Sequence, residues 1–241
     1  MKYIYVGYKF SRASYLAGLL RPQIISDLEL ESYGFKYLPR NPSSFTPTKQ
    51  DSIYKGKYLL LGDDPIDNWK SIAQFSHSDA DRYPKYEEFL GKVREIMQPV
   101  LDNPLPEWQS LRGGWKERLQ SWSTLYQLMR VAYRNRSVLI SFYELFTGPA
   151  QQILDRWFES DILKTTLATD AVIGALNGPH QNGSAYVLLH HVMGEAAGKK
   201  GVWAYVEGGM GALSEAIAAS ARNYGMNKII IIIVVAVVIV E

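Results

Sequence analysis

The sequence contains no cysteine among its 241 residues. This absence excludes a disulfide framework, a thiolate nucleophile, a CxxC redox pair and a thiolate metal site, so any redox chemistry must use a bound cofactor. The chain also has little net charge, because 26 Lys and Arg residues stand against 24 Asp and Glu residues. Such an evenly interleaved balance does not indicate a nucleic-acid partner. With 47% apolar residues, the chain has enough hydrophobic surface to build a globular core.

Several motifs are missing as well. The sequence has no GxGxxG, no P-loop, no GxSxG elbow and no HExxH, so it gives no support to hydrolysis and we assign no metal site. Met1–Phe10 lacks the apolar core of a signal peptide, which argues against secretion. The twelve apolar residues Ile229–Val240 are fewer than the roughly 18 expected of a membrane-spanning helix. Because eleven of the twelve are β-branched, this run predicts a strand buried on both faces.

The middle of the chain is predicted to be helical. In Asp81–Leu101, apolar residues recur at helical spacing from Tyr86 to Val100, and charged residues occupy the other face. The other predicted helices are Tyr15–Leu28 with Pro22 interrupting it, Trp115–Arg134, Leu139–Phe146, Ala150–Phe158, Asp161–Leu176 after a Ser160 N-cap, and Ser184–Met193.

Both ends of the sequence contain strand patterns. Near the N-terminus, Phe35–Leu38 and Tyr58–Leu61 read as short strands on either side of a Pro- and Ser-rich loop, Pro39–Thr48. Near the C-terminus, a strand at Val202–Val206 is followed by a Gly208-Gly209 turn, a helix over Ala212–Tyr224 and Gly225 at its end. The turn brings a helix N-terminus close to the sheet. It is either a turn that faces a cofactor or a tight strand-to-helix connection with no ligand. The pattern predicts a helical domain inserted into an α/β nucleotide-binding domain.

Three side chains are candidates for chemistry in the helical middle. Asp170 follows Leu163 by seven residues, which places a carboxylate beside the apolar stripe of its predicted helix. It is either a substrate-cavity acid or a carboxylate that braces the helix end. His190 and His191 point about 100° apart on a helix and cannot easily share one metal, so one is expected to face the interior and the other solvent.

Several segments together resemble a known family, the phytoene-desaturase-like members of the FAD-dependent amine-oxidase superfamily. The resemblance runs from about Gly7 to Tyr224. The motifs that carry it are GYKFSRASYL (Gly7–Leu16), RPQIISDLEL (Arg21–Leu30), RNPSSFTP (Arg40–Pro47), YEEF (Tyr86–Phe89), LATDAVIGA (Leu167–Ala175), YVLLHHVMG (Tyr186–Gly194) and GGMGALSEAIAASA (Gly208–Ala221).

The resemblance implies a fold of the α/β class with mixed elements: part of a two-domain FAD/NAD(P)-binding fold with a largely helical substrate domain inserted. It implies that the N-terminal βαβ unit and the C-terminal half are missing, so that the chain is a central fragment. The expected domains are a remnant of the FAD-binding domain with the start of the substrate domain (1–63), the helical substrate domain (64–200), and a truncated strand-turn-helix-strand return (201–241).

Carried over position by position, the resemblance also implies site residues. Asp170, His190 and His191 match the substrate domain and are the catalytic candidates. The residues expected near the FAD are Gly7, Phe10, Ser11, Ala13, Ser14, Gly208, Gly209 and Met210.

The resemblance therefore implies a flavoprotein oxidoreductase, phytoene dehydrogenase-like, that acts on a hydrophobic small molecule in the mitochondrial matrix, or otherwise in the cytoplasm. A mitochondrial protein partner and a role in regulating mitochondrial function follow from the same resemblance. Because the glycine fingerprint is absent, the alternative is a catalytically inactive fragment that serves as a helical interaction or regulatory module. Neither reading includes nucleic acid or a transmembrane span.

Overall fold

The computed structural model describes residue 14 and residues 16–102 and 114–225. The apolar run Ile229–Val240, predicted as a buried strand, lies outside the described residues. Two units divide the chain: the first combines Met1–Ser43 with Gly194–Glu241, and the second is Ser44–Met193. The chain therefore leaves the first unit and returns to it after a long excursion, while the predicted domain boundaries after residues 63 and 200 stay predictions.

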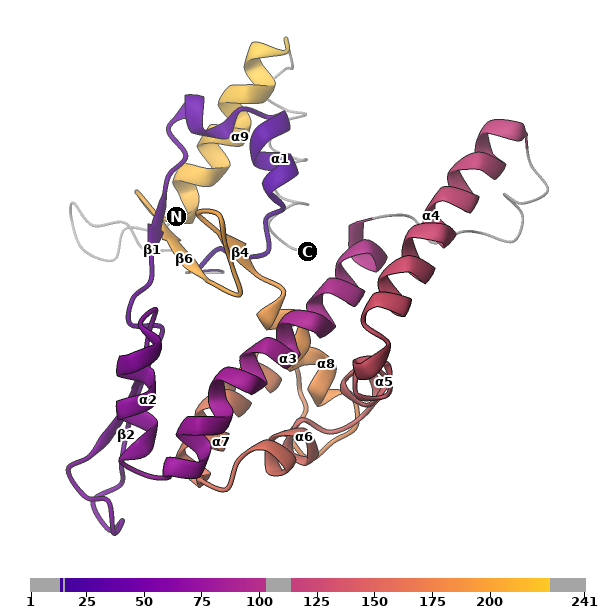
Figure 1. The fold of residues 1–241 in the computed structure, drawn as a ribbon. Coiled ribbons are helices and arrows are strands. Elements are labelled where there is room, and N and C mark those ends of the chain that lie inside the picture. Colours follow the sequence, from indigo (N-terminus) through magenta and orange to yellow (C-terminus); the bar gives the residue numbers. More distant parts are fainter. Residues whose placement is uncertain (1–13, 15, 103–113, 226–241) are drawn as a thin grey trace. The chain divides into compact units, whose positions relative to one another are not determined.

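Antiparallel strands organise the first unit (Figure 1). β1 (Tyr37–Pro39) pairs with β6 (Ala204–Val206), with Leu38 opposite Tyr205. β4 (Glu195–Ala196) and β5 (Lys199–Lys200) form a hairpin. The unit also contains α1 (Pro22–Asp27), a 3₁₀ turn (Leu30–Tyr33) and α9 (Met210–Asn223). Its core is built from Ala17, Leu30, Phe35, Val206, Leu213, Ala216 and Ile217.

Local chemistry explains where this unit differs from the sequence prediction. The helix predicted over Tyr15–Leu28 is reduced to α1, which starts at Pro22. Proline begins this helix instead of interrupting it, because its fixed φ and missing N–H suit the first helical position. α9 begins at Met210, two residues earlier than predicted, and its predicted end is confirmed by Gly225 at φ +79°. Tyr224, predicted as the last residue of this helix, lies just after α9 and is 67% exposed.

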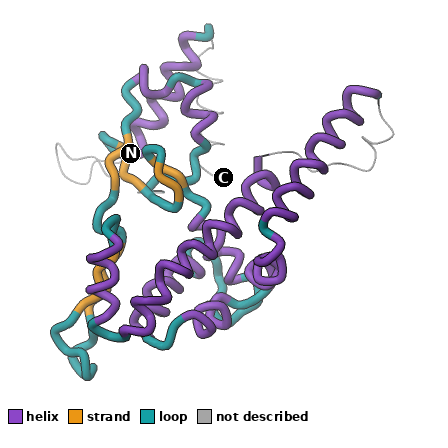
Figure 2. Tube along the Cα trace, in the orientation of Figure 1, coloured by secondary structure: helices purple, strands orange, loops and turns teal. Residues whose placement is uncertain are grey.

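The second unit is mostly helical (Figure 2). It opens with the antiparallel pair β2 (Ser44–Pro47) and β3 (Tyr58–Leu61), in which Phe45 lies opposite Leu60. β2 falls in the Pro- and Ser-rich segment predicted as a loop, because pairing with the apolar β3 overrides local turn preferences. The helices are α2 (Pro65–Ala73), α3 (His77–Asp102), α4 (Trp115–Arg134), α5 (Leu139–Thr147), α6 (Ala150–Trp157), α7 (Asp161–Ala168) and α8 (Ser184–Val192).

α7 is shorter than predicted. The sequence predicts a helix to Leu176, but α7 ends at Ala168 and a 3₁₀ turn, Thr169–Ala171, follows. Two threonine hydroxyls near this end donate to carbonyls four residues back: Thr166 to Ile162 at 2.8 Å and Thr169 to Thr165 at 3.3 Å. Such bonds compete with regular helix geometry, so the helix tightens and stops here.

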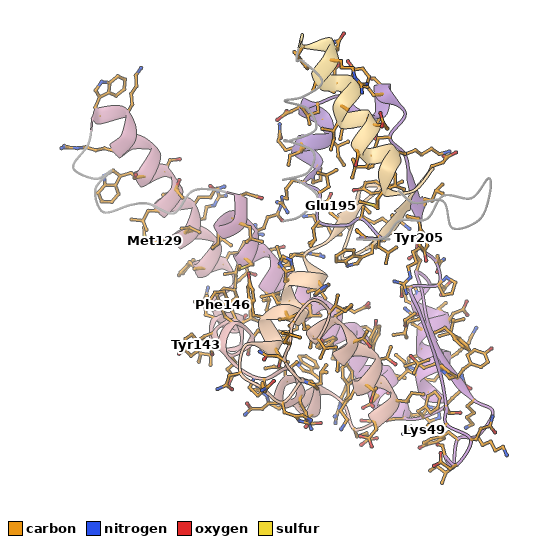
Figure 3. The ribbon with its side chains drawn as sticks, turned by 180° about the vertical axis from the view of Figure 1, so that it is seen from behind. Lys49, Met129, Tyr143, Phe146, Glu195 and Tyr205 are labelled. Atoms are coloured by element: carbon orange, nitrogen blue, oxygen red, sulfur yellow. The ribbon has the colours of Figure 1, made fainter. Side chains whose placement is uncertain are left out.

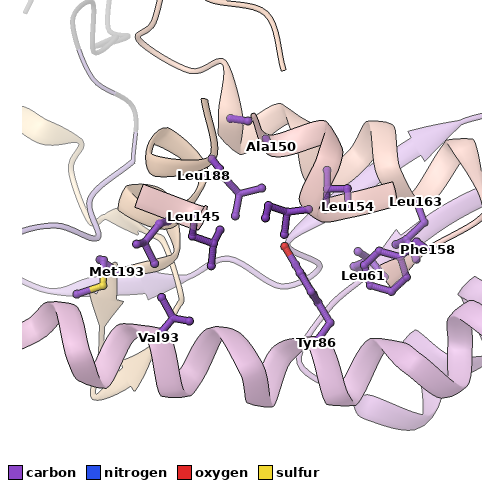
Figure 4. Packing of buried hydrophobic residues seen from close by; sticks show 14 of the residues in the cluster. Leu61, Tyr86, Val93, Leu145, Ala150, Leu154, Phe158, Leu163, Leu188 and Met193 are labelled. Carbon is purple, nitrogen blue, oxygen red and sulfur yellow. The ribbon is translucent and has the colours of Figure 1, made fainter. Parts of the chain in front are cut away.

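The apolar face of α3 forms one side of the core of the second unit (Figure 4). Tyr86, Val93, Ile96 and Met97 are buried on it, as the periodicity predicted. Tyr86, Val93 and Met97 pack in one cluster with residues from β3, from the later helices and from the segments beside them: Leu61, Leu145, Leu154, Phe158, Leu163, Leu188 and Met193. The mixed helix and small-sheet composition agrees with the predicted α/β class.

A buried carboxylate ties the start of α3 to the start of α7. Asp79 is 0% exposed, and its two carboxylate oxygens accept the backbone N–H groups of Glu159 at 3.0 Å and Ser160 at 2.8 Å. Ser160 occupies the N-cap position as predicted, but its own side chain makes no capping hydrogen bond. Asp79 thus satisfies donors at the entry to α7 that the sequence assigned to a local cap.

α4 is amphipathic like α3, but most of its large apolar side chains are exposed instead of buried. Its Ser121 and Thr124 are buried, and α4 packs against α3. Leu125 and Leu128 are half-buried, whereas six other large apolar side chains of α4 are 56–72% exposed: Trp115, Leu119, Trp122, Tyr126, Met129 and Tyr133. No helix in the described ranges is both long and apolar enough to cross a membrane.

Candidate functional site

The Gly208-Gly209 turn joins β6 to α9, as predicted. Gly208 has φ +79°, and Gly209 has φ +77° with ψ 179°, a backbone conformation that is essentially restricted to glycine. Gly209 donates its N–H to the carbonyl of Val206 at 2.8 Å, and Ala212 donates to the carbonyl of Gly209 at 2.9 Å. A Cβ on Gly208 would lie 3.2 Å from the Cβ of Ala212. The turn therefore requires glycine, and the N-terminus of α9 follows it directly.

The second segment expected near the cofactor lies beside the strand that leads into this turn. Ala17 pairs with Ala204 of β6 through two backbone hydrogen bonds of 2.9 Å. The hydroxyl of Ser14 donates to the carbonyl of Leu16 at 3.0 Å, so its proton is committed to a local turn. Gly7, Phe10, Ser11 and Ala13 lie outside the described residues. The structure thus brings the end of the GYKFSRASYL segment next to β6.

Asp170 lies in the 3₁₀ turn after α7 and is half-buried. Its charge acts on two tyrosines of α3, Tyr83 and Tyr86. Burial is the main reason that the pKa of Tyr86 is raised, and the charges of Asp170 and then Glu87 raise it further. For Tyr83, burial again raises the pKa most, followed by the charge and the hydrogen bond of Glu87, with smaller effects of Tyr86 and Asp170.

This Tyr83, Tyr86, Glu87 and Asp170 cluster was not predicted as a site. Much of Glu87 is exposed, yet its carboxyl is desolvated enough to raise its pKa, which the Tyr83 hydroxyl partly offsets by hydrogen bonding. Tyr86 lies edge-on to Phe158 and Trp157, with ring centroids 5.1 and 5.6 Å away. Both phenols therefore stay neutral at physiological pH and can donate hydrogen bonds. The YEEF motif was the available signal, but its link to Asp170 spans more than eighty residues.

The two histidines of α8 are both half-buried, and the expectation that one faces the interior and the other solvent stays a prediction. Their rings stand perpendicular at 5.8 Å. His191 Nδ1 lies 2.8 Å from the carbonyl of Val187, so this nitrogen carries the proton. Burial, and then the charge of His191, lower the pKa of His190. In the described part of the chain, no group of three His, Asp or Glu side chains could hold a metal ion.

A cavity of about 590 Å³ lies in the first unit, beside α1 and the β4-β5 hairpin. The carboxylates of Glu29, Glu31 and Glu195 line it together with the ring of Tyr37. Of the predicted site residues that the structure describes, none contributes to its wall. The hydroxyl of Tyr37 is buried and has no hydrogen-bond partner among the described residues, and burial raises its pKa.

The described residues thus form a mixed chain of helices and small sheets with a glycine-dependent strand-turn-helix return, and comparison with known proteins indicates its class. No family model matches the chain, and no solved structure matches it significantly. Two curated relatives, from Rattus norvegicus and Mus musculus, are 50% and 49% identical to it over 224 residues, 92% of this chain and 39% of each relative. Their names indicate a pyridine nucleotide-disulfide oxidoreductase domain family.

Both the rat and the mouse relative carry the name pyridine nucleotide-disulfide oxidoreductase domain-containing protein 2. The chain is similar to this protein over 92% of its own length, and it spans about two-fifths of the length of these relatives. The relation to the phytoene desaturases stays a prediction. An uncharacterized protein of Mycobacterium tuberculosis is 26% identical over 219 residues, 89% of this chain and 36% of that protein. Because the chain has no cysteine, the disulfide chemistry in the relatives' name has no thiol here to carry it.

Proposed function

We propose that the chain is the central part of an FAD-dependent oxidoreductase related to the phytoene desaturases. The observation that carries the proposal is its identity to the oxidoreductase-domain relatives over nearly all of its own length. The glycine-dependent turn at the start of α9 supports the same reading, since such a turn allows a cofactor to approach the backbone closely. Since the chain covers 39% of the rat relative, the activity is proposed for the longer protein.

The described residues fit a flavin at one place. At Gly208 and Gly209 a side chain would be strained, and the start of α9 directs backbone N–H groups toward one side of the turn. When bound, FAD supplies hydride transfer. The chain's own residues would position the cofactor at this turn, and the helical second unit would hold a hydrophobic small molecule and exclude water from it.

Flavin content tests this proposal. The 241-residue chain, which lacks GxGxxG, is expected to bind FAD weakly or not at all, because no glycine fingerprint holds the pyrophosphate. A version extended upstream to the length of the relatives is expected to purify with stoichiometric flavin, visible in its absorbance spectrum. An extended protein that folds but binds no FAD would contradict the proposal.

Asp170 offers a test inside the helical part. In the extended protein, Asp170→Asn keeps the side chain's shape but removes its charge. If Asp170 acts in a substrate cavity, turnover falls at least about tenfold while the melting temperature stays the same. If it braces the turn after α7, about 0.5–2 kcal/mol of stability is lost and turnover per folded molecule is intact. A loss of stability with intact turnover would show that Asp170 has no role in the reaction.

A second candidate function is a helical interaction or regulatory module without a cofactor. The exposed apolar side of α4 favours it, since an exposed patch of this kind marks an interaction site. A protein partner in the mitochondrial matrix would serve this second candidate, whereas a role in regulating mitochondrial function is proposed for the oxidoreductase. Imaging a tagged full-length protein tests the location, and exclusive staining of another compartment would contradict it.

A further inference from the structure

α4 carries a regular stripe of large apolar side chains, and the structure leaves it uncovered. We call the six residues Trp115, Leu119, Trp122, Tyr126, Met129 and Tyr133 the α4 stripe. Their separations are 4, 3, 4, 3 and 4 residues, which is the repeat of a coiled-coil seam. Each is more than half exposed, from 56% for Met129 to 72% for Tyr133. Figure 3 shows Met129 of α4 and Tyr143 of α5 along one edge of the second unit.

The exposure of the stripe is not a consequence of a helix without partners. α4 packs against α3, and the side that it buries carries Ser121 and Thr124. The contact is fixed at its end by Arg134 and Asn135, which both donate to the Glu95 carboxylate. α4 therefore covers one side within its own unit, where Leu125 and Leu128 are half-buried beside Ser121 and Thr124, and it leaves the α4 stripe exposed.

The length and area of the stripe suit a second helix of the same repeat. The 20 residues of α4 span about 30 Å. Aromatic and large aliphatic side chains with this exposure offer roughly 700 Å² on each partner, so pairing two copies would bury about 1,400 Å². That area is in the range of stable interfaces, and a copy of α4 has the matching repeat without any further requirement.

Charges beside the stripe select the orientation. In an antiparallel pair centred between Trp122 and Tyr126, Lys116 would lie beside Arg130 of the other copy. In a parallel, in-register pair, Arg118 lies next to Ser123 of the other copy, and Arg130 lies next to its Leu125. The parallel arrangement thus avoids like charges at the edges of the seam.

We propose that α4 pairs with α4 of a second copy of this chain, parallel and in register, through the α4 stripe. The inference goes beyond the proposed oxidoreductase activity and does not depend on it. A dimer without flavin and a flavoprotein that stays monomeric are distinct results, so the failure of either proposal is recognised separately.

Sedimentation equilibrium of the full 241-residue chain tests the pairing. The chain is expected to be dimeric at micromolar concentration, and Trp122→Glu and Tyr126→Glu are each expected to raise the dimer dissociation constant at least about a hundredfold. Circular dichroism checks that the helices persist. Ile53→Glu, at a position 91% exposed in the β2-β3 loop, is the matched control and should leave the dimer unchanged.

The absence of native cysteine gives a direct test of orientation. Leu119→Cys is expected to form an intermolecular disulfide under mild oxidation, since the two copies of position 119 meet only in the parallel arrangement. A chain that stays monomeric at a concentration of 100 µM in about 0.15 M salt would overturn the proposal. So would a dimer that survives both glutamate substitutions, or a monomer whose stripe binds anionic lipid vesicles instead.

Discussion

α3 and α4 are neighbouring helices of one unit with similar sequence periodicity and opposite orientation. α3 buries its apolar residues, Val93 and Met97 among them, and even a carboxylate, Asp79. α4 buries Ser121 and Thr124 and exposes its tryptophans. Periodicity therefore determines which side chains share a face of a helix, but the partners of the helix determine which face is covered.

Placing a carboxylate on each helix gives the largest expected difference. Val93→Asp puts a charge where the native side chain is 0% exposed, and should cost more than about 4 kcal/mol or prevent folding. Tyr126→Asp, at a site 65% exposed, should cost less than about 1 kcal/mol. Urea denaturation measures the free energy of unfolding of both variants, at a protein concentration low enough to exclude association through α4. Equal losses would mean that the apolar sides of the two helices are equally covered.

The sequence predicts much of this comparison, and its failures have physical causes. The helix at α3 and the glycine end of α9 follow from local periodicity and from one left-handed residue. The Gly208-Gly209 turn is equally local, because its backbone angles require glycine. The outward side of α4 could not be predicted, since it depends on a contact with α3 rather than on the order of residues in α4.

The buried polar contacts were missed for a related reason. Asp79 binds backbone groups 80 and 81 positions away, and the sequence contains no sign of such a partner. Asp170 was expected on a regular helix beside an apolar stripe, but it lies in a 3₁₀ turn where its charge acts on Tyr83 and Tyr86. Long-range pairing of polar groups is decided by the packing of several elements at once.

The second largest effect is expected at that carboxylate of α3. Asp79→Ala removes the carboxylate that accepts the partly buried N–H groups of Glu159 and Ser160, which should cost about 2–4 kcal/mol. Asp79→Asn keeps one acceptor and should lose about half as much. The free energy of unfolding of both variants provides the measurement. If the alanine variant were as stable as the native chain, Asp79 would not hold the entry to α7.

The inward side of α4 gives a smaller and more discriminating effect. If helix orientation followed hydrophobicity alone, Ser121→Leu would stabilise the chain. Ser121 is 7% exposed, so the larger side chain must displace its neighbours and should cost about 1–3 kcal/mol. Ser123→Leu, on the exposed side, is the matched control and should change stability by less than about 0.5 kcal/mol. A stabilised Ser121→Leu variant would show that α4 can turn its apolar side inward.

The smallest effect is expected in α8, which packs against α3 and carries the half-buried His190 and His191. Burial lowers the pKa of His190 from its ordinary value of 6.5, and the charge of His191 lowers it further. Below 6.5 the unfolded chain takes up a proton that the folded chain resists, so stability should fall as the pH drops from 6.5 toward the lowered value. His190→Gln should remove this loss, and His191→Gln should narrow its pH range. His180→Gln, in an exposed loop, is the control, and a native pH dependence in the His190 variant would assign the effect to another group.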